Sequence, residues 1–528
     1  MRSGALAGTA ALVRFVLRRD RVRILVWLGA IAVLVMSSAA SVAGLYPTAE
    51  SLAQAATLIE GNAVIMAFNG PAQGVDTLGG RVAFELGAFT FVTAALMSVF
   101  MISRLTRADE ENGRTELLLS APLGRYAPAA SAVVVVTAMN LVLGVLVAVG
   151  LISQNLPTTG SVAFGAAMTA TGLVFAGVAL VAAQATESAR VVTGSSGAAV
   201  ALAYVIRAAG DVGDGTLSWA SPLGWGQKVR AFAGEQWWPL LLSIGFAMAL
   251  VVVAGALIER HDVGAALLAP RPGPATATPR LGSPLGLAWR LQRGTVLWWA
   301  IGIFLTGLAY GSVADSVDEF VQDNEAMRDM IAAGGGDLTD AFFGTTLLML
   351  GFGAAGYAVQ ATLRLRSEET AGRVEPLLAT PMSRAAWLGS HLAVALVGSA
   401  LVVAAGGFGL GLTYGIISGD LSEAPRLTGL ALVYLPAVWL MAGAALALIG
   451  VLPRAALAAW GALGAIFVLG FFGSLLDLPE SVRAVSPYEH IPLVPSEPTT
   501  VVPMVIITAL AVAFVVLGLV AFRRRDLA

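Results

Sequence analysis

The sequence contains no cysteine, a single lysine and three histidines, and only 12% of its 528 residues are charged. The absence of cysteine excludes disulfides, thiol nucleophiles and cysteine metal ligands. The histidines, His261, His391 and His490, lie far apart and form no ligand cluster. No paired carboxylates or Ser/His set accompany the apolar segments either. An intramembrane enzyme acting on lipid is therefore a weak alternative.

The chain also lacks the motif with which many ATPases hold phosphate. That motif, G-x-x-x-x-G-K-S/T, needs a lysine, and the single lysine, Lys228, lies in a segment expected on the outer side. Ion-coupled carriers usually keep ionisable groups at the middle of their spans. Here Glu85, Arg207 and His391 lie near expected span ends, where interfacial positions are the ordinary explanation. We therefore expect a non-catalytic chain powered by an external ATPase.

Apolar residues are abundant: they make up 57% of the chain and occur in long runs. Runs of about 18 or more apolar residues predict membrane-spanning helices. The sequence thus predicts an all-α polytopic membrane protein with about twelve transmembrane helices. The expected spans are roughly 24–44, 83–103, 129–152, 162–184, 190–208, 239–258, 295–314, 342–363, 387–415, 427–451, 455–475 and 501–522.

The distribution of arginine predicts the orientation. If both termini are cytoplasmic, only seven of the 31 basic residues lie outside. The inner loops of membrane proteins carry such an excess of Lys and Arg. We expect cytoplasmic N- and C-termini in the cell (plasma) membrane.

A charged stretch occurs twice in the sequence. Residues 107–125 read RADEENGRTELLLSAPLGR and residues 366–384 read RSEETAGRVEPLLATPMSR, at a constant offset of 259. Ser221-Pro222 likewise matches Ser486-Pro487 before the last span of each half. The duplication predicts two parallel six-helix repeats, related by a pseudo-two-fold axis along the membrane normal.

The repeat sets the expected domains. Residues 1–261 form the first half and residues 282–528 the second, joined by a Pro-rich cytoplasmic linker at 262–281. Two short segments, 4–20 and 282–293, mix apolar and basic residues before a Trp-bearing span. We expect both to be amphipathic helices on the cytoplasmic leaflet.

The charged loops at 104–125 and 364–384 are the candidate functional site. Loops beside spans often carry only solvated charge. Both copies nevertheless keep carboxylates where the positive-inside rule favours arginine. Acidic residues followed by Gly and Glu-x-Leu-Leu predict a short surface helix, with carboxylates near its N-terminus and charges offered to a partner.

At these residues the chain resembles the permease subunits of ABC type-2 exporters, in which this loop forms the coupling helix that inserts into the ATPase. The fused two-half form resembles the actinobacterial permeases described as polyketide-antibiotic (tetronasin-type) exporters. Thr370 stands where the first copy has Glu111, so that the two docking sites differ. The coupling residues that we infer, apart from the matching Pro122 and Pro381, are Glu110, Glu111, Gly113, Arg114, Glu116, Arg125, Glu369, Gly372, Arg373, Glu375 and Arg384.

The resemblance implies an exporter that works by alternating access on an apolar drug- or antibiotic-like molecule. Its partners would be two copies of a cytoplasmic ABC ATPase subunit, which would hold ATP and Mg, together with membrane lipids and the small substrate. We expect no cofactor or metal on this chain and no nucleic acid. An ion-coupled carrier of the major facilitator type remains the alternative, because Asp109…Gly113-Arg114 faintly matches its loop motif.

Aromatic residues on the second and fifth spans of each half are candidates for the substrate pathway, since these spans flank the central axis in the resembled family. Ordinary helix packing is the competing explanation. The candidates are Phe89, Phe91, Phe100, Tyr204, Phe352, Tyr357, Phe467 and Phe471.

Overall fold

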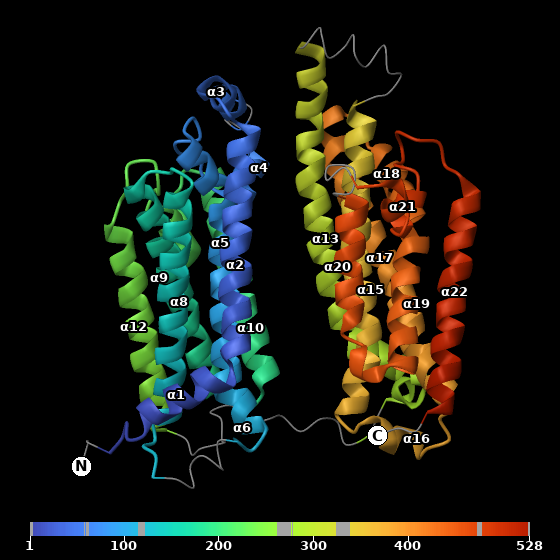
Figure 1. Ribbon diagram of the computed structural model, residues 1–528, viewed down its shortest axis with the longest axis horizontal. Coiled ribbons are helices and arrows are strands. Elements are labelled where there is room, and N and C mark those ends of the chain that lie inside the picture. Colours follow the sequence, from blue (N-terminus) through green and yellow to red (C-terminus); the bar gives the residue numbers. More distant parts are fainter. Residues whose placement is uncertain are drawn as a thin grey trace. The chain divides into compact units, whose positions relative to one another are not determined.

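The computed structural model describes residues 4–57, 59, 63–114, 122–260, 276, 278–323, 338–471 and 478–525, and among these residues it contains helices and no strand. The chain divides into two compact units, Met1–Gly273 and Pro274–Ala528 (Figure 1). The division falls within the Pro-rich segment between the spans at Trp238–Ile258 and Pro284–Ser312.

Eleven of the described helices are long and apolar enough to cross a membrane. They match eleven of the twelve predicted spans and confirm a polytopic all-α membrane protein. Such helices suit hydrocarbon because every backbone polar group is satisfied within the segment. The remaining predicted span, 455–475, contains α20 (Ala458–Phe471), an apolar helix of 14 residues. Residues 472–477 lie outside the described part of the chain.

In unit 1, four of the other long helices pack around α9. The spans are α2 (Arg21–Leu45), α5 (Leu78–Ser103), α8 (Ala127–Ser153), α9 (Thr158–Ala185), α10 (Ala189–Val212) and α12 (Trp238–Ile258). Helix α9 packs against α5, α8 and α12, while α2 packs against α5 and α8. Glycine permits a close contact between α8 and α9: a Cβ at Gly144 in α8 would lie 2.6 Å from the Gly165 carbonyl oxygen of α9. The shorter helices include α1 (Thr9–Arg19), α3 (Ala49–Thr57) and α4 (Ala63–Asn69).

Unit 2 repeats this packing around α19. Its long helices are α13 (Pro284–Asp323), α15 (Leu338–Thr370), α17 (Arg384–Ser418), α19 (Leu435–Val451) and α22 (Val501–Arg524), with α18 (Glu423–Ala431) leading into α19 and the shorter α20 in the fifth place. Helix α19 packs against α15, α17 and α22, and α13 packs against α15 and α17. Helices that hold the same place in the two halves of the sequence therefore have the same neighbours within their own units.

The units differ at their first helices. In unit 1, α1 ends at Asp20, whose φ of −100° and ψ of 12° interrupt the helix before α2 begins. In unit 2, the segment expected as a separate interfacial helix, 282–293, runs from Pro284 directly into the span as part of α13. No residue between Pro284 and the span breaks the helix as Asp20 does.

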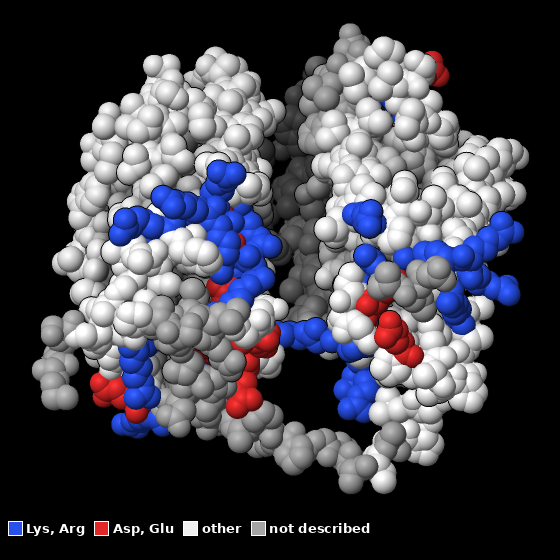
Figure 2. Space-filling view, turned by 60° about the horizontal axis from the view of Figure 1, so that its bottom comes forward, with Lys and Arg blue, Asp and Glu red and all other residues white. Residues whose placement is uncertain are grey.

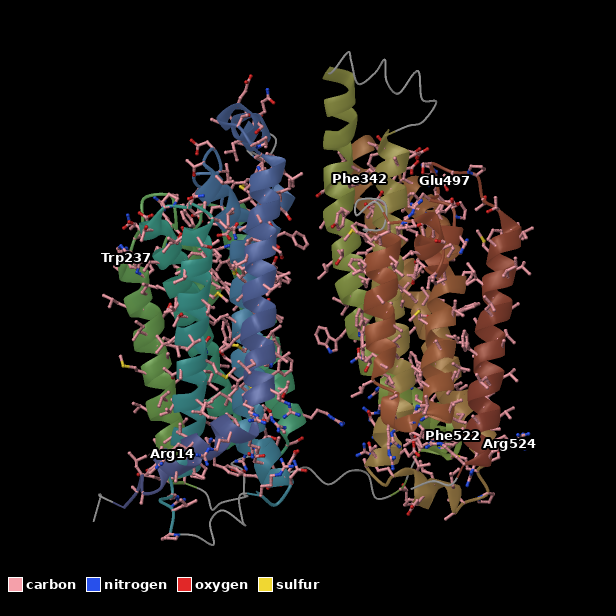
Figure 3. All side chains as sticks on the ribbon, in the orientation of Figure 1. Arg14, Trp237, Phe342, Glu497, Phe522 and Arg524 are labelled. Atoms are coloured by element: carbon pink, nitrogen blue, oxygen red, sulfur yellow. The ribbon has the colours of Figure 1, made fainter. Side chains whose placement is uncertain are left out.

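Each unit has a basic end, which we define by α1 and the end of α12 in unit 1, and by α16 (Val374–Leu378) and the end of α22 in unit 2. Arginine side chains gather at this end of each unit (Figure 2). Figure 3 places Arg14 of α1 and Arg524 of α22 there, and Trp237 at the opposite end of unit 1.

Candidate functional site

The second span of each unit continues beyond its apolar part and ends on a glycine. In unit 1, α5 continues through a π-helical turn, η1 (Arg104–Ala108), into α6 (Asp109–Glu111). Gly113 and Gly372 then adopt φ values of +68° and +67°, and the N–H of each donates to the carbonyl three residues earlier at 2.9 Å. Such left-handed ends favour glycine. We call residues 104–114 and 364–373 the junctions.

The charges that the repeat preserves pair with one another within each junction. Arg107 Nη1 lies 2.6 Å from Glu110 Oε2, and the matching Arg366 Nη1 lies 3.0 Å from Glu369 Oε2. The next positions make a second matching pair. Arg114 Nη1 is 3.1 Å from Asp109 Oδ1, and Arg373 Nε is 2.6 Å from Glu368 Oε2. The duplicated sequence therefore forms the same two ion pairs in both units.

These pairs change the interpretation of two candidate carboxylates. Glu110 and Glu369 were expected to offer their charge to a partner, but each is bound by arginine of its own unit. The side chain of Glu369 is only 3% exposed, and its Oε2 also lies 2.7 Å from Arg525 Nη2. Because a surface helix continues from each apolar span, an arginine three residues before a glutamate falls on the same helix face. These carboxylates brace the helix ends.

Glu375 differs from them, because it is exposed and has no side-chain partner among the described residues. It lies in α16, directly after the glycine. Val374 is buried, and Leu377 and Leu378 pack against the core of unit 2. The predicted surface helix is thus present in unit 2, with its apolar side anchored and Glu375 presented outward. Its counterpart Glu116 lies in 115–121, outside the described residues.

Arg125 and Arg384, the last residues of the repeated stretch, bind the ends of the sixth spans. Arg125 Nη2 donates to the Ile258 carbonyl at 2.7 Å, at the end of α12. Arg384 Nη1 donates to the Arg525 carbonyl at 2.8 Å, just after α22. A cation at a helix C-terminus satisfies free carbonyls and complements the helix dipole. Both arginines therefore act as matching caps.

The two copies of the repeat differ where Glu111 in the first copy is replaced by Thr370 in the second, and these two side chains make different hydrogen bonds. Glu111 Oε1 accepts the backbone N–H of Ala189 at 2.7 Å, which satisfies the first residue of α10. Thr370 instead donates its hydroxyl to the Arg366 carbonyl of its own helix. The two junctions therefore differ in what they hold: only the first is tied to the fifth span of its unit through this position.

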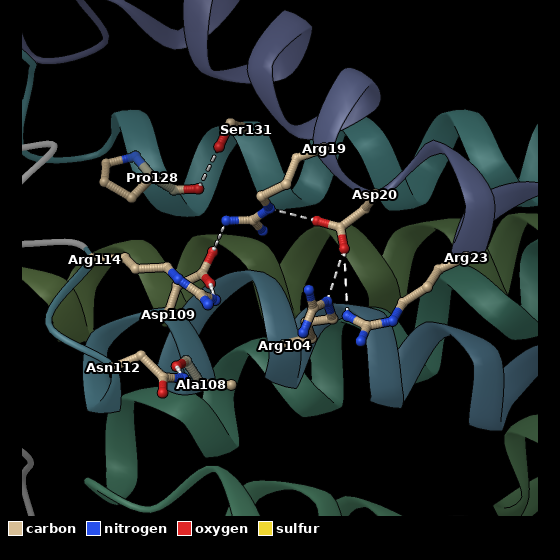
Figure 4. Close-up of polar contacts among 10 residues, drawn as sticks. All are labelled: Arg19, Asp20, Arg23, Arg104, Ala108, Asp109, Asn112, Arg114, Pro128 and Ser131. Carbon is tan, nitrogen blue, oxygen red and sulfur yellow. Dashed lines mark hydrogen bonds and ion pairs between the residues drawn. The ribbon is translucent and has the colours of Figure 1, made fainter. Parts of the chain in front are cut away.

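Asp20 joins α1 to the junction of unit 1, a role that the sequence analysis missed. The buried Asp20 carboxylate lies 2.7 Å from Arg19 Nε, 2.8 Å from Arg104 Nε and 3.4 Å from Arg23 Nη1. Arg19 Nη1 also reaches Asp109 Oδ2 at 2.8 Å (Figure 4). In the sequence, this role is indicated by the fact that Asp20 is the only acidic residue before Glu50 and has arginines on both sides.

The two Ser-Pro matches share a hydrogen bond at the opposite end of each unit. The buried Ser221, before α11 (Pro222–Gln227), donates to the Ala203 carbonyl of α10 at 2.6 Å. The buried Ser486, before the 3-10 turn η6 (Pro487–His490), donates to the Ile466 carbonyl of α20 at 3.4 Å. In both units the serine ties the segment before the sixth span to the fifth.

Three of the aromatic pathway candidates lie in packed interiors. The Phe91 ring is 5.6 Å from that of Phe164, and the Phe352 ring is 3.9 Å from that of Tyr488. Tyr357 is fully buried and donates its hydroxyl to the Val394 carbonyl at 3.1 Å. Their position fits helix packing.

The remaining aromatic candidates are more accessible. Phe89 and Phe100, 56% and 42% exposed, lie along α5, and Phe100 stacks on Trp27 at 6.1 Å. Tyr204 donates to the Phe68 carbonyl at 2.8 Å. Phe467 and Phe471 in α20 stack on each other at 5.5 Å. The Phe467 ring also lies 5.0 Å from that of Phe352, so that Phe352, Phe467 and Phe471 form one continuous aromatic cluster in unit 2.

These features define a multi-pass all-α membrane protein, built from two similarly packed units whose second spans end in matching junctions. Over 529 residues the chain is 43% identical to the Multidrug efflux system permease protein Rv1217c of Mycobacterium tuberculosis (strain ATCC 25618 / H37Rv). The alignment covers 99% of this chain and 96% of the relative. The family described as Multidrug efflux system permease Rv1217c, C-terminal domain, matches residues 281–523. The chain belongs to this family of multidrug efflux system permeases.

Proposed function

We propose that this permease is the membrane subunit of an ATP-driven ABC exporter whose ATPase is a separate chain. Two ATPase copies, carrying ATP and Mg²⁺, would dock at the basic ends of the two units, which we place in the cytoplasm. The units would act as parallel repeats and move an apolar drug- or antibiotic-like molecule outward by alternating access. Membership of an efflux permease family supports this proposal, as does the absence of a phosphate-binding motif from the sequence.

The observation that carries the proposal is the presentation of α16. The apolar side of α16 is anchored in unit 2, and its exposed Glu375 points outward. The Glu375 carboxylate is therefore free to bind a partner, because it pairs with no described side chain of its own unit. The ion pairs of the junction brace the end of α15 directly before it. A force applied to α16 is therefore passed to a span that is packed on α13, α17 and α19.

Charge reversal at the exposed carboxylates tests the proposal. Truncating a carboxylate that forms a solvent-exposed ion pair costs only about 0.2–1 kcal/mol, whereas opposing like charges across an interface costs several kcal/mol. We therefore expect Glu375→Arg combined with Glu116→Arg to abolish substrate-stimulated ATP hydrolysis by the assembled complex. Membrane insertion and thermal stability should not change in the Glu375→Arg single variant, because Glu375 has no internal partner among the described residues.

Glu480→Arg is the matched control. Glu480 is also exposed at the start of a short surface helix, α21 (Glu480–Arg483), but it lies at the opposite end of unit 2 (Figure 1). This variant should keep its ATPase stimulation. Wild-type transport and stimulation in the Glu116/Glu375 double variant would show that coupling does not pass through these helices.

A further inference from the structure

The second span of unit 2 exposes a single side chain along its central part. Among the described candidate spans of unit 2, this helix is the most buried. Between residues 346 and 366, all of which the structure describes, Gln360 is the one exposed residue. A polar amide is thus presented where the helix is otherwise packed or partly covered.

Two indoles frame this glutamine. Trp299 Nε1 of α13 donates to Gln360 Oε1 at 2.6 Å. One turn earlier, a Cβ at Gly356 would lie 3.1 Å from the Trp299 ring and 3.8 Å from the Trp460 ring of α20. The indole of Trp460 is 41% exposed. Helices α13, α15 and α20 therefore build one aromatic surface beside the amide.

The contact with Trp299 fixes how the amide points. An indole N–H can only donate, so that the oxygen of Gln360 must face Trp299 and the NH₂ group must face away. No partner for Nε2 occurs among the described residues. Gln360 lies four residues before Arg364, which at 1.5 Å per residue is about 6 Å along the helix. The donors therefore lie just inside the basic end.

An amide left without a hydrogen-bond partner in an apolar environment costs about 1–3 kcal/mol. Tryptophans alone at this depth are common, because indoles favour the interface between water and hydrocarbon. The interfacial preference of tryptophan does not explain why the exposed residue of this otherwise covered span is a glutamine. Two amide hydrogens beside exposed indoles suit an aromatic ligand that carries a hydrogen-bond acceptor.

We propose that Gln360, Trp299 and Trp460 form a substrate-recognition site for neutral aromatic molecules that bear a carbonyl group, taken up from the membrane leaflet at the basic end. The ring of the substrate stacks on the indoles, and its carbonyl accepts a hydrogen bond from Gln360 Nε2. Trp299 is a positioning residue, because it turns the donors outward. The site rests on the efflux function of the family and not on the identity of the energy source.

Photo-crosslinking of the full chain in native membranes tests this site. Benzophenone is a neutral diaryl ketone that both accepts a hydrogen bond and crosslinks on illumination, and adducts are mapped by peptide mass spectrometry. We expect adducts on the peptides that contain Trp299, Gln360 or Trp460. Because one neutral hydrogen bond is lost, Gln360→Leu should lower this labelling at sub-saturating probe about three- to ten-fold.

A probe without an acceptor separates recognition from structure. Labelling of the same peptides by phenyl(trifluoromethyl)diazirine should be unchanged in Gln360→Leu and lowered in Trp460→Leu. Thr345→Val is the matched control, because Thr345 is exposed on the same helix but its hydroxyl bonds to the Ala341 carbonyl. Unchanged ketone labelling in Gln360→Leu, or an equal loss with both probes, would overturn the proposal. Neither labelling experiment requires ATP. A failure of the ATPase proposal would therefore leave these labelling results unchanged, and the two proposals can fail independently.

Discussion

Replacing the junction glycines by alanine should loosen both second spans by the same amount. A Cβ at Gly372 or Gly113 would meet nothing within 4 Å, so that packing contributes no cost. The left-handed φ values of +67° and +68° remain, and they cost a non-glycine residue about 1–2 kcal/mol. Part of this is offset by the reduced freedom of the unfolded chain. We therefore expect a net loss of about 1 kcal/mol at each junction.

A glycine inside a helix provides a control of opposite sign. Gly389 in α17 also has nothing within 4 Å of a built Cβ, but its backbone does not lie in the left-handed region. Alanine there should stabilise the helix by about 0.5–1 kcal/mol. The two substitutions thus add the same methyl group to equally open space and differ only in the backbone conformation that receives it.

Hydrogen exchange of the full chain in detergent measures these local effects. A loss of about 1 kcal/mol corresponds to about five-fold faster exchange of the amides at the end of α15 in Gly372→Ala. Gly113→Ala should show the same change at the end of α6, and Gly389→Ala should slow exchange in α17. If Gly372→Ala slowed exchange as Gly389→Ala does, the left-handed helix end would be wrong, and with it the equivalence of the two junctions.

Three further outcomes follow from contacts at the basic ends. Asp20→Asn should speed hydrogen exchange in α1 about five- to thirty-fold, because it removes the carboxylate shared by three arginines. This fold-change corresponds to a loss of about 1–2 kcal/mol of local stability, which is modest because the arginines are partly solvated. Arg125→Gln and Arg384→Gln should each speed exchange about two- to five-fold, in the last turns of α12 and α22 respectively, and not in the other unit. Glu111→Ala should loosen the first turn of α10 by about 1 kcal/mol, whereas Thr370→Ala should leave α20 unchanged; equal effects would contradict the proposed asymmetry.

The spans were predictable because burial in hydrocarbon demands long apolar runs, and such runs are visible in one sequence. The ion pairs of the junctions cannot be read from the sequence, because the apolar run ends near residue 103 and the charged residues after it are typical of a loop. Once the helix is known to continue, Arg107 and Glu110 fall on one face. The contact of Asp20 with Arg104 joins residues 84 positions apart and depends on tertiary packing.

The aromatic pathway candidates show a second limit. Phe89 and Phe91 lie two residues apart on α5, and both are plausible from composition. One is largely exposed and the other is buried against Phe164. A helix turns by about 200° over two residues, so that the neighbours of the helix decide which ring is accessible. The sequence does not single out Gln360 for the related reason that the exposure of a residue within a span depends on the surrounding helices.

The most direct test of the proposed energy source is purification of the tagged full chain from its native host in mild detergent, followed by native mass spectrometry. We predict that an ATP-binding subunit co-purifies at two copies per chain, and that Glu116→Arg with Glu375→Arg removes it. If the permease instead purified alone, and its transport in proteoliposomes responded to a proton gradient but not to ATP, the account of an ATP-driven exporter would be contradicted.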